Sequence, residues 1–406
     1  MSRNPTIHTN KGMTINGITL IFLFLASLNT INRYYYFIFI AFAIFLLRPR
    51  RKFRFDAYLV PLFILAISWA IFAPASMISV FGPIKPFTYA LCYLMGFSFF
   101  DDERVQSNNM ISYKSFYWFV GIISAGPFVH YIFNWIKNGN ADERNTVDLW
   151  TNSVMAATGQ AALACLPLAL AVACLFMKSN KGLKFLAFAS LVLIVMYNLV
   201  LAGRTLIALL LIAVVGALVH QLCEMKRGKL RLILSLLIII VLIAFIYQIN
   251  LLGVRDYIES SLLYDRFFGE HAMDLDEDGR LEKKIYYLKN MFAHPFGGAN
   301  MREQMGYAHD IYLDTYDEAG IFAFAAILIY IVASLIRMIK CVKDKTLPFQ
   351  FRQVVFCVYL LLYIEFMVEP ILQGMPWLFA SFCLIDGYVA RILSEKRKKK
   401  RREIKV

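Results

Sequence analysis

The residues best suited to chemistry gather in the segment 279–323, a polar stretch in an otherwise apolar chain. It contains Arg280, His309 and, between them, the turn His294–Gly298 with the sequence HPFGG. An arginine can hold phosphate oxygens, and a histidine beside carboxylates can serve as a general base near neutral pH. We therefore expect the active site in this segment, with His309 as base and Arg280 as a phosphate ligand.

His309 precedes a run of acidic residues that begins with Asp310. We expect His309 to open a short helix that enters a membrane span at Gly320. The spacing then places His309, Leu313, Tyr316 and Gly320 on one helical face. The structural alternative is a histidine that only hydrogen-bonds a neighbouring loop.

Other charged residues fall at the edges of apolar blocks or inside them. Arg204 lies between two such blocks, where an arginine is costly unless it pairs with an anion or reaches the headgroups. Glu365 and Glu369 are four residues apart within one block, and they could pair with an arginine or line an acceptor pocket. Arg144 lies in a second, smaller loop, 137–153.

A helix is also predicted at the start of the polar segment. Leu281, Ile285, Leu288 and Phe292 recur at helical spacing and form an apolar stripe. Such a helix can rest on the membrane surface and hold Arg280 at the depth of lipid phosphates. Pro295 and the paired glycines after it end this helix in a tight reversal, in which His294 serves as a turn residue.

The sequence favours no metal site. Asp274, Asp276 and Asp278 resemble the first half of a calcium loop, but the twelfth position is Ile285, where such loops need a bidentate glutamate. An acidic, solvated turn is the preferred interpretation. The seven cysteines lack metal-ligand spacing, and we expect no disulfide because all of them fall in spans or on the cytoplasmic side.

The elements that must position these residues are membrane helices. The chain has 406 residues, of which 59% are hydrophobic and 17% charged, and the apolar residues form long blocks. This composition predicts an all-α polytopic membrane protein, a single integral domain over 1–406 with about twelve transmembrane helices. The first block is expected to be a span and not a removable signal peptide. The predicted spans are 15–31, 33–47, 56–73, 86–100, 115–136, 155–177, 184–202, 205–222, 232–251, 319–339, 353–370 and 375–393.

The distribution of Lys and Arg predicts the orientation. Basic clusters occupy alternate connections, at 48–54, 178–184, 226–231 and 337–345, and the tail 394–406. Both termini are therefore expected in the cytoplasm, and the large loop 252–318, with seven basic and fourteen acidic residues, outside it. The net charge of +14 arises from these clusters, so it indicates orientation and a lipid anchor in the tail, not nucleic acid.

Four local motifs together resemble the O-antigen ligase and polymerase family, membrane enzymes that act on undecaprenyl-diphosphate-linked glycans. Two are Gly-Arg pairs, Gly203-Arg204 at the start of a span and Gly279-Arg280 at the start of the loop helix. The third is the HPFG turn, and the fourth is His309 with Leu313 and Gly320 leading into a span. The order of the motifs and the large outer loop extend the resemblance over nearly the whole chain.

The resemblance implies a GT-C-like glycosyltransferase in the bacterial inner membrane, with its active site on the periplasmic side and no metal or other cofactor. Arg280 and Arg204, with Arg144, would bind the diphosphate, and His309 would accept the proton of the attacking hydroxyl. The residues implied in diphosphate or acceptor binding are Arg204, Arg144, Glu365, Glu369 and Asp310.

The resemblance leads us to predict an O-antigen ligase, which transfers a preassembled glycan from undecaprenyl diphosphate to lipid A–core. The alternative is a polymerase of O-antigen, capsule or exopolysaccharide that uses the same donor, and a transporter or flippase is a more distant one. Two features depart from the family. Asp310 occupies a position that is commonly Asn, and the loop is rather short. The expected partners are the lipid-linked donor, the glycolipid acceptor and the bilayer, while the oligomeric state stays open.

Overall fold

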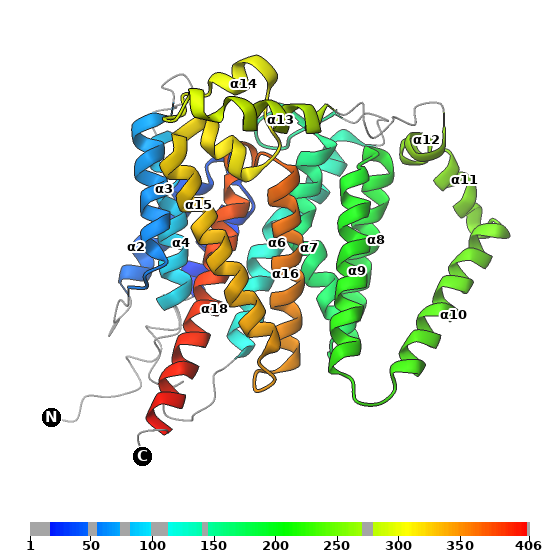
Figure 1. Cartoon of the computed structure of the whole chain (residues 1–406). Helices are drawn as coiled ribbons and strands as arrows, with labels where there is room; N and C mark the ends of the chain where they lie inside the picture. The colour runs from blue at the N-terminus through cyan, green and yellow to red at the C-terminus, as the bar shows by residue number, and fades with distance from the viewer. Residues whose placement is uncertain are drawn as a thin grey trace. The chain divides into compact units, whose positions relative to one another are not determined.

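The computed structural model describes residues 17–47, 55–73, 82–98, 113–139, 145–269 and 279–403. Within these ranges the chain is mostly helical (Figure 1). The exception is a short antiparallel ribbon of β1 (Asn145–Val147) and β2 (Val154–Ala156), in which Thr146 lies opposite Met155. The predicted class of a helical, polytopic membrane protein is confirmed, whereas the ribbon was not predicted.

Eight helices in the described ranges are long and apolar enough to cross a membrane, and each coincides with a predicted span. An apolar helix satisfies its own backbone hydrogen bonds, which is why this element can exist in lipid. The eight are α6 (Tyr113–Asn138), α7 (Ala157–Phe176), α8 (Lys181–Leu201), α9 (Arg204–Glu224), α10 (Lys229–Gln248), α15 (Ile311–Lys343), α16 (Phe349–Val368) and α18 (Pro376–Glu403).

Four shorter apolar helices coincide with the first four predicted spans. They are the helix Gly17–Ser27, α2 (Tyr34–Leu46), α3 (Leu59–Phe72) and α4 (Phe87–Ser98). A helix as long as α3, with 14 residues, reaches about 21 Å, less than the roughly 30 Å of a hydrocarbon core. The total of twelve spans therefore stays a prediction.

The chain divides into two compact units, each assembled from segments far apart in the sequence. The first unit comprises residues 1–130, 279–347 and 362–406. In it α4 packs against α18, and α3 against α15. Two glycines permit the first contact, because a Cβ on Gly96 would lie 2.0 Å from the Leu384 carbonyl oxygen and one on Gly387 would lie 2.2 Å from that of Tyr93. Such close approach of backbones is typical of membrane helices.

The second unit comprises residues 131–278 and 348–361. In it α7 packs against α8 and α9, and α12 (Leu262–Phe268) packs against α8. The chain reverses after α8 at Ala202, whose φ is 53°. Arg266 of α12 stabilises this reversal by donating a hydrogen bond of 2.6 Å to the Ala202 carbonyl oxygen.

The predicted large loop contains short helices, as expected. In the second unit these are α11 (Val254–Glu259) and α12. In the first unit α13 (Arg280–Asn290) and α14 (Asn300–Met305) lie across the end of the helices at which α15 begins (Figure 1). This arrangement brings the predicted catalytic segment to one end of the first unit.

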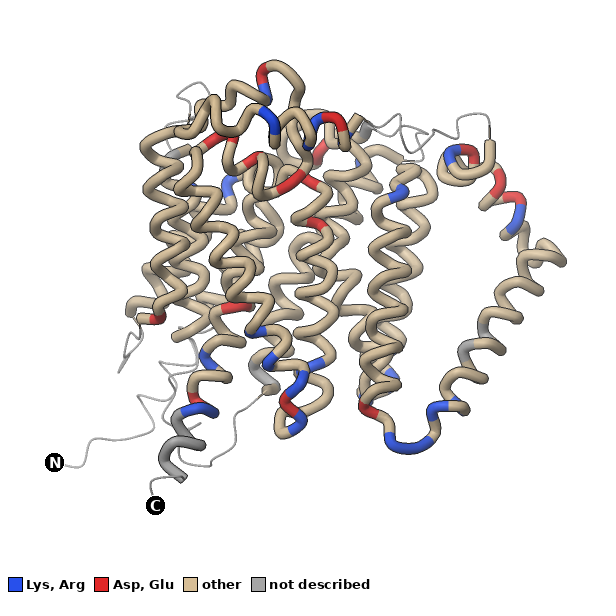
Figure 2. Tube along the Cα trace, viewed as in Figure 1, with Lys and Arg blue, Asp and Glu red and all other residues tan. Residues whose placement is uncertain are grey.

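The charged residues of each unit lie mainly at the ends of its helices (Figure 2). In the first unit Lys and Arg gather at the C-terminal ends of α15 and α18, and acidic residues gather where α15 begins. In the second unit the connection between α9 and α10 is basic. The predicted orientation, with both termini in the cytoplasm, stays a prediction. The predicted basic cluster 48–54 lies outside the described residues, while α18 continues through the predicted tail to Glu403.

Candidate functional site

Helix α13 forms the outer wall of the site, and its predicted apolar stripe is exposed. Leu281, Ile285, Leu288 and Phe292 are 42% to 77% exposed. Tyr287, on another face of the helix, is fully buried. It packs in a small cluster with Met301, Ala308, Leu313 and Tyr316. The helix is thus held by Tyr287, and its stripe remains available for contact with lipid.

The HPFGG turn fastens the loop to a break in α15. Helix α15 loses helical geometry at Gly320, where φ is 76° and ψ is −173°. The Pro295 carbonyl oxygen accepts a hydrogen bond of 2.9 Å from the Ile321 amide. A Cβ on Gly297 would lie 2.6 Å from the Glu318 carbonyl oxygen, and one on Gly320 would lie 2.7 Å from that of Pro295. The two glycines therefore allow a backbone-to-backbone contact that no side chain would permit.

The start of α15 corrects one prediction about His309. The helix begins at Ile311, and Asp310 is its N-cap, since its Oδ1 accepts hydrogen bonds of 3.0 and 3.3 Å from the amides of Tyr312 and Leu313. His309 precedes the helix with a φ of 56°. The prediction that His309 opens the helix and shares its face was wrong, because the cap at Asp310 excludes it.

Asp314 holds this left-handed residue in place from the first turn of α15. Its Oδ1 accepts a hydrogen bond of 2.7 Å from the Ala308 amide, and its Oδ2 accepts one of 3.0 Å from the Asp310 amide. The two amides flank His309, so one buried carboxylate fixes the backbone on both sides of it. The unusual φ of His309 is thus determined by its surroundings, as is common at functional sites.

Glu369 lies between the two predicted catalytic residues. Its Oε1 is 3.5 Å from Nη2 of Arg280, and its Oε2 is 3.7 Å from Nδ1 of His309. Arg280 is also anchored by Nη1, which donates a hydrogen bond of 3.0 Å to the Val368 carbonyl oxygen. Glu369 is 5% exposed, and Glu365, one turn earlier in α16, is fully buried. A carboxylate in this position can orient the imidazole.

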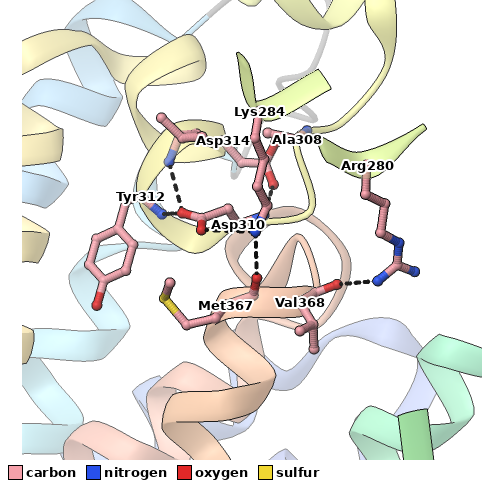
Figure 3. A network of polar contacts seen from close by, with 9 residues as sticks. Arg280, Lys284, Ala308, Asp310, Tyr312, Asp314, Met367 and Val368 are labelled. Carbon is pink, nitrogen blue, oxygen red and sulfur yellow. Dashed lines mark hydrogen bonds and ion pairs between the residues drawn. The ribbon is translucent and has the colours of Figure 1, made fainter. Parts of the chain in front are cut away.

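Lys284, one turn after Arg280 on α13, completes the arrangement (Figure 3). Its Nζ is 3.3 Å from Oδ2 of Asp310 and donates a hydrogen bond of 2.9 Å to the Met367 carbonyl oxygen. Arg280 and Lys284 thus both reach the C-terminal end of α16, where carbonyl groups attract cations. The side chains of Arg280, Lys284 and His309 remain 27%, 28% and 25% exposed. They are therefore accessible to a ligand.

A second ion pair lies deeper in the same end of the unit. Arg302 Nη1 is 2.8 Å from Oε1 of Glu318, and Gln373 donates a hydrogen bond of 2.9 Å to the other oxygen. Burial is the largest single effect on the pKa of Arg302 and lowers it, but the charge and hydrogen bond of Glu318, together with Tyr307 and Asp317, raise the pKa overall. Burial, reinforced by the charge of Arg33, lowers the pKa of Lys85, and Glu318 counteracts this effect. Glu318 is thus a local centre of negative charge among cations.

The structure brings together five of the residues predicted from the sequence, all in the first unit: Arg280, His309, Asp310, Glu365 and Glu369. Arg204 opens α9 in the second unit, so its role beside Arg280 stays a prediction. Arg144 and the acidic turn Asp274–Asp278 lie outside the described residues.

Lys284 and Arg302 were not predicted as site residues. A signal for Lys284 was present, since it follows Arg280 by four residues and such neighbours share a helical face. No comparable signal existed for Arg302, because its partner Glu318 lies sixteen residues away. Glu369 was predicted as a ligand-binding residue, but its position between Arg280 and His309 was not.

Among the described residues, no group of three or more His, Cys, Asp or Glu side chains is arranged to hold a metal ion. Comparison of the sequence with models of protein families and with curated proteins finds no match. The site therefore has to be interpreted from its own geometry, beside the four motifs that resemble the O-antigen ligase family.

Proposed function

We propose that the protein is a membrane-embedded glycosyltransferase, an O-antigen ligase that transfers a preassembled glycan from undecaprenyl diphosphate to lipid A–core. The observation that carries the proposal is the carboxylate of Glu369, which lies within 4 Å of both Arg280 and His309. Glu369 thus lies beside both Arg280, a cation that can bind phosphate, and His309, a base that can accept the proton of a hydroxyl.

The donor's diphosphate is bound by two partly exposed cations of α13, Arg280 and Lys284. Arg280 and Lys284 lie one turn apart, and each keeps about a quarter of its side chain exposed. A guanidinium can hold two phosphate oxygens at once, and an ammonium adds a mobile point charge. Both groups stabilise the negative charge that grows on the leaving diphosphate. Arg204 and Arg144 are proposed as further phosphate ligands from the second unit and the smaller loop.

His309 takes the proton of the acceptor hydroxyl. Its Nδ1 faces Oε2 of Glu369 at 3.7 Å, and a movement of less than 1 Å would bring the pair to hydrogen-bond distance. With its Nδ1 proton directed to Glu369, the ring leaves Nε2 as the proton acceptor. The acceptor oxygen then forms a bond to the anomeric carbon of the donor. The bond from that carbon to the phosphate oxygen breaks, and undecaprenyl diphosphate leaves with the electron pair.

The exposed stripe of α13 supports a lipid-linked donor over a soluble one. Leu281 and Leu288 are 70% and 56% exposed on the helix that also carries Arg280. A helix of this kind lies at the boundary between headgroups and acyl chains. Arg280 would then meet a diphosphate at the depth where the lipid carrier presents it. We propose that this face is periplasmic and that the membrane is the bacterial inner membrane.

The test is a reconstituted assay with purified protein, the lipid-linked glycan and lipid A–core, without ATP or an ion gradient. We expect product in the presence of EDTA, since no step requires a metal. We expect none from His309→Ala or Arg280→Ala, although both variants should insert and fold. His294→Ala and Lys289→Ala are the matched controls, because they change a histidine and a cation of the same loop outside the site.

Three results would contradict parts of the proposal. Normal turnover by His309→Ala would exclude His309 as the base. Inhibition by EDTA that is reversed by added metal would exclude a metal-independent reaction. Product formed only when a second lipid-linked repeat unit replaces lipid A–core would identify a polymerase. Deletion of the gene provides an independent check: full-length glycan accumulates on the carrier for a ligase and single repeat units for a polymerase.

A further inference from the structure

The opposite end of the first unit contains a cavity of about 490 Å³, far from the candidate active site. Its residues come from the segment just before α3, from the C-terminal end of α4 and from the C-terminal halves of α15 and α18. Along α15 the lining residue Arg337 lies roughly 26 Å from Gly320, at 1.5 Å per residue. The basic-end cavity, as we term it, is lined by Phe55, Asp56, Tyr58, Phe97, Ile336, Arg337, Lys340, Ala390, Leu393, Ser394 and Arg397.

Arg337 is a preorganised cation in the wall of this cavity. Its side chain is 4% exposed, and its Nε donates a hydrogen bond of 2.9 Å to Asp386, which Nη2 also contacts. Tyr330 donates a further hydrogen bond of 2.9 Å to the same carboxylate, and the guanidinium lies 4.0 Å from the ring centre of Tyr58. The hydrogen-bonded ion pair with Asp386 and the contact with the Tyr58 ring thus hold Arg337 in one orientation.

The third guanidinium nitrogen of Arg337, Nη1, lacks an acceptor in the described part of the chain, and this indicates that a ligand binds there. Nη1 is buried and has no hydrogen-bond partner among the described residues. A buried donor left without an acceptor is costly, and native structures satisfy most such groups. Because Arg337 lines the cavity, an anionic oxygen bound there would supply the missing acceptor.

The rest of the lining defines the chemistry of that ligand. Lys340 and Arg397 add two exposed cations, whereas Asp56 is the acid of the lining and already accepts a hydrogen bond of 2.8 Å from Tyr93. Six of the remaining residues are apolar or aromatic. The volume falls within the roughly 300–1,000 Å³ of ordinary ligand pockets. A cationic rim over an apolar wall matches a phosphate ester attached to an apolar body.

We propose that the basic-end cavity binds a phosphate ester, such as the headgroup of an anionic phospholipid, in the leaflet opposite the active site. The phosphate accepts from Nη1 of Arg337 and is contacted by Lys340 and Arg397. The apolar wall, with Ile336 and Leu393, receives the first carbons of an acyl chain. Such a site would bind the protein to anionic lipid through a specific contact, in addition to the general attraction of its basic ends.

The experiment titrates the purified full-length protein with dioleoyl phosphatidylglycerol and counts bound lipids by native mass spectrometry. The variant is Lys340→Gln with Arg397→Gln, because both side chains are exposed and neither is needed to pair a buried acid. The matched control is Lys343→Gln with Lys345→Gln, which removes the same charge at the same end outside the cavity. We expect the tightest lipid to bind about 30-fold more weakly to the cavity variant, at about a factor of five or six for each cation, and within twofold of wild type to the control.

Equal weakening in both double variants, or none in either, would overturn the proposal, since binding would then be nonspecific or located elsewhere. Competition with glycerol 3-phosphate distinguishes the two possible sources of the phosphate ester, which are a phospholipid headgroup and a soluble molecule. Displacement of the lipid shows that a soluble phosphate ester can occupy the site, and retention shows that the acyl chain is required. Dioleoyl phosphatidylcholine, which has no net charge, should bind more weakly than phosphatidylglycerol to wild type but not to the cavity variant.

Discussion

Replacement of Glu369 by glutamine is the most direct test of the site, because it removes one charge while it preserves shape. Glu369 lies 3.5 Å from Arg280 and 3.7 Å from the imidazole of His309. As His309 takes a proton, it gains a positive charge that the carboxylate stabilises. At an effective dielectric of about 20, two unit charges about 4 Å apart interact by roughly 4 kcal/mol.

That figure is an upper limit for the effect on the rate. Arg280 lies beside the same carboxylate and opposes the charge on His309, and the glutamine keeps a hydrogen-bond acceptor. Hydrogen bonds to charged groups contribute about 1.5–3 kcal/mol, which corresponds to roughly 10- to 150-fold. We therefore expect Glu369→Gln to lower kcat about 100-fold. The change in KM should be smaller, because Arg280 keeps its hydrogen bond to the Val368 carbonyl oxygen.

The assay is steady-state transfer in the reconstituted system, with the lipid-linked donor varied in excess over the enzyme, so that kcat and KM are both measured. Glu282→Gln is the matched control, since this glutamate is exposed on the first turn of α13. Thermal unfolding in detergent should show that both variants are folded. A kcat for Glu369→Gln within threefold of wild type would refute the assigned role of Glu369, and an equal loss in Glu282→Gln would show that the site responds only to net charge.

The other predictions concern how the site is held. Gly297→Ala should lower the free energy of unfolding by about 1–3 kcal/mol and reduce transfer, because its Cβ would lie 2.6 Å from the Glu318 carbonyl oxygen in a left-handed conformation. Asp310→Ala should cost about 1 kcal/mol as a lost N-cap, while Asp310→Asn keeps the cap and loses only the ion pair with Lys284. Arg302→Gln should cost about 3 kcal/mol, since Glu318 is left buried without its cation. Thermal and denaturant unfolding measure all three.

The outcomes that would contradict these predictions differ. For the glycine, Gly298→Ala is the control, because its Cβ would meet only the Asn300 side chain at 3.0 Å. Equal stability losses in the two variants would argue against the contact with α15. For Asp310, an asparagine variant as unstable as the alanine variant would show that the ion pair, not the cap, holds the start of the helix. For Arg302, a free energy of unfolding of Arg302→Gln equal to that of wild type would show that the ion pair with Glu318 is exposed to solvent and not buried.

Much of the fold follows from local sequence. The eight long apolar helices coincide with predicted spans, because a run of about 20 apolar residues satisfies its backbone internally and needs no particular neighbour. Helix α13 was also predicted from local sequence, in this case from the helical spacing of Leu281, Ile285 and Leu288. The start of α15 was misplaced by two residues, at His309 instead of Ile311, because the start is fixed by the hydrogen bonds of the cap at Asp310.

The sequence by itself thus determined the class of the protein, its membrane helices and the types of residue in the site. Only the tertiary structure decided which residues meet. Glu369 is 89 residues from Arg280 along the chain, and it lies beside both Arg280 and His309 because α16 ends beneath the loop. Likewise Gly297 and Gly320 are needed because two backbones touch. Contacts of this kind depend on how helices pack, and packing is a property of the whole fold that local periodicity does not encode.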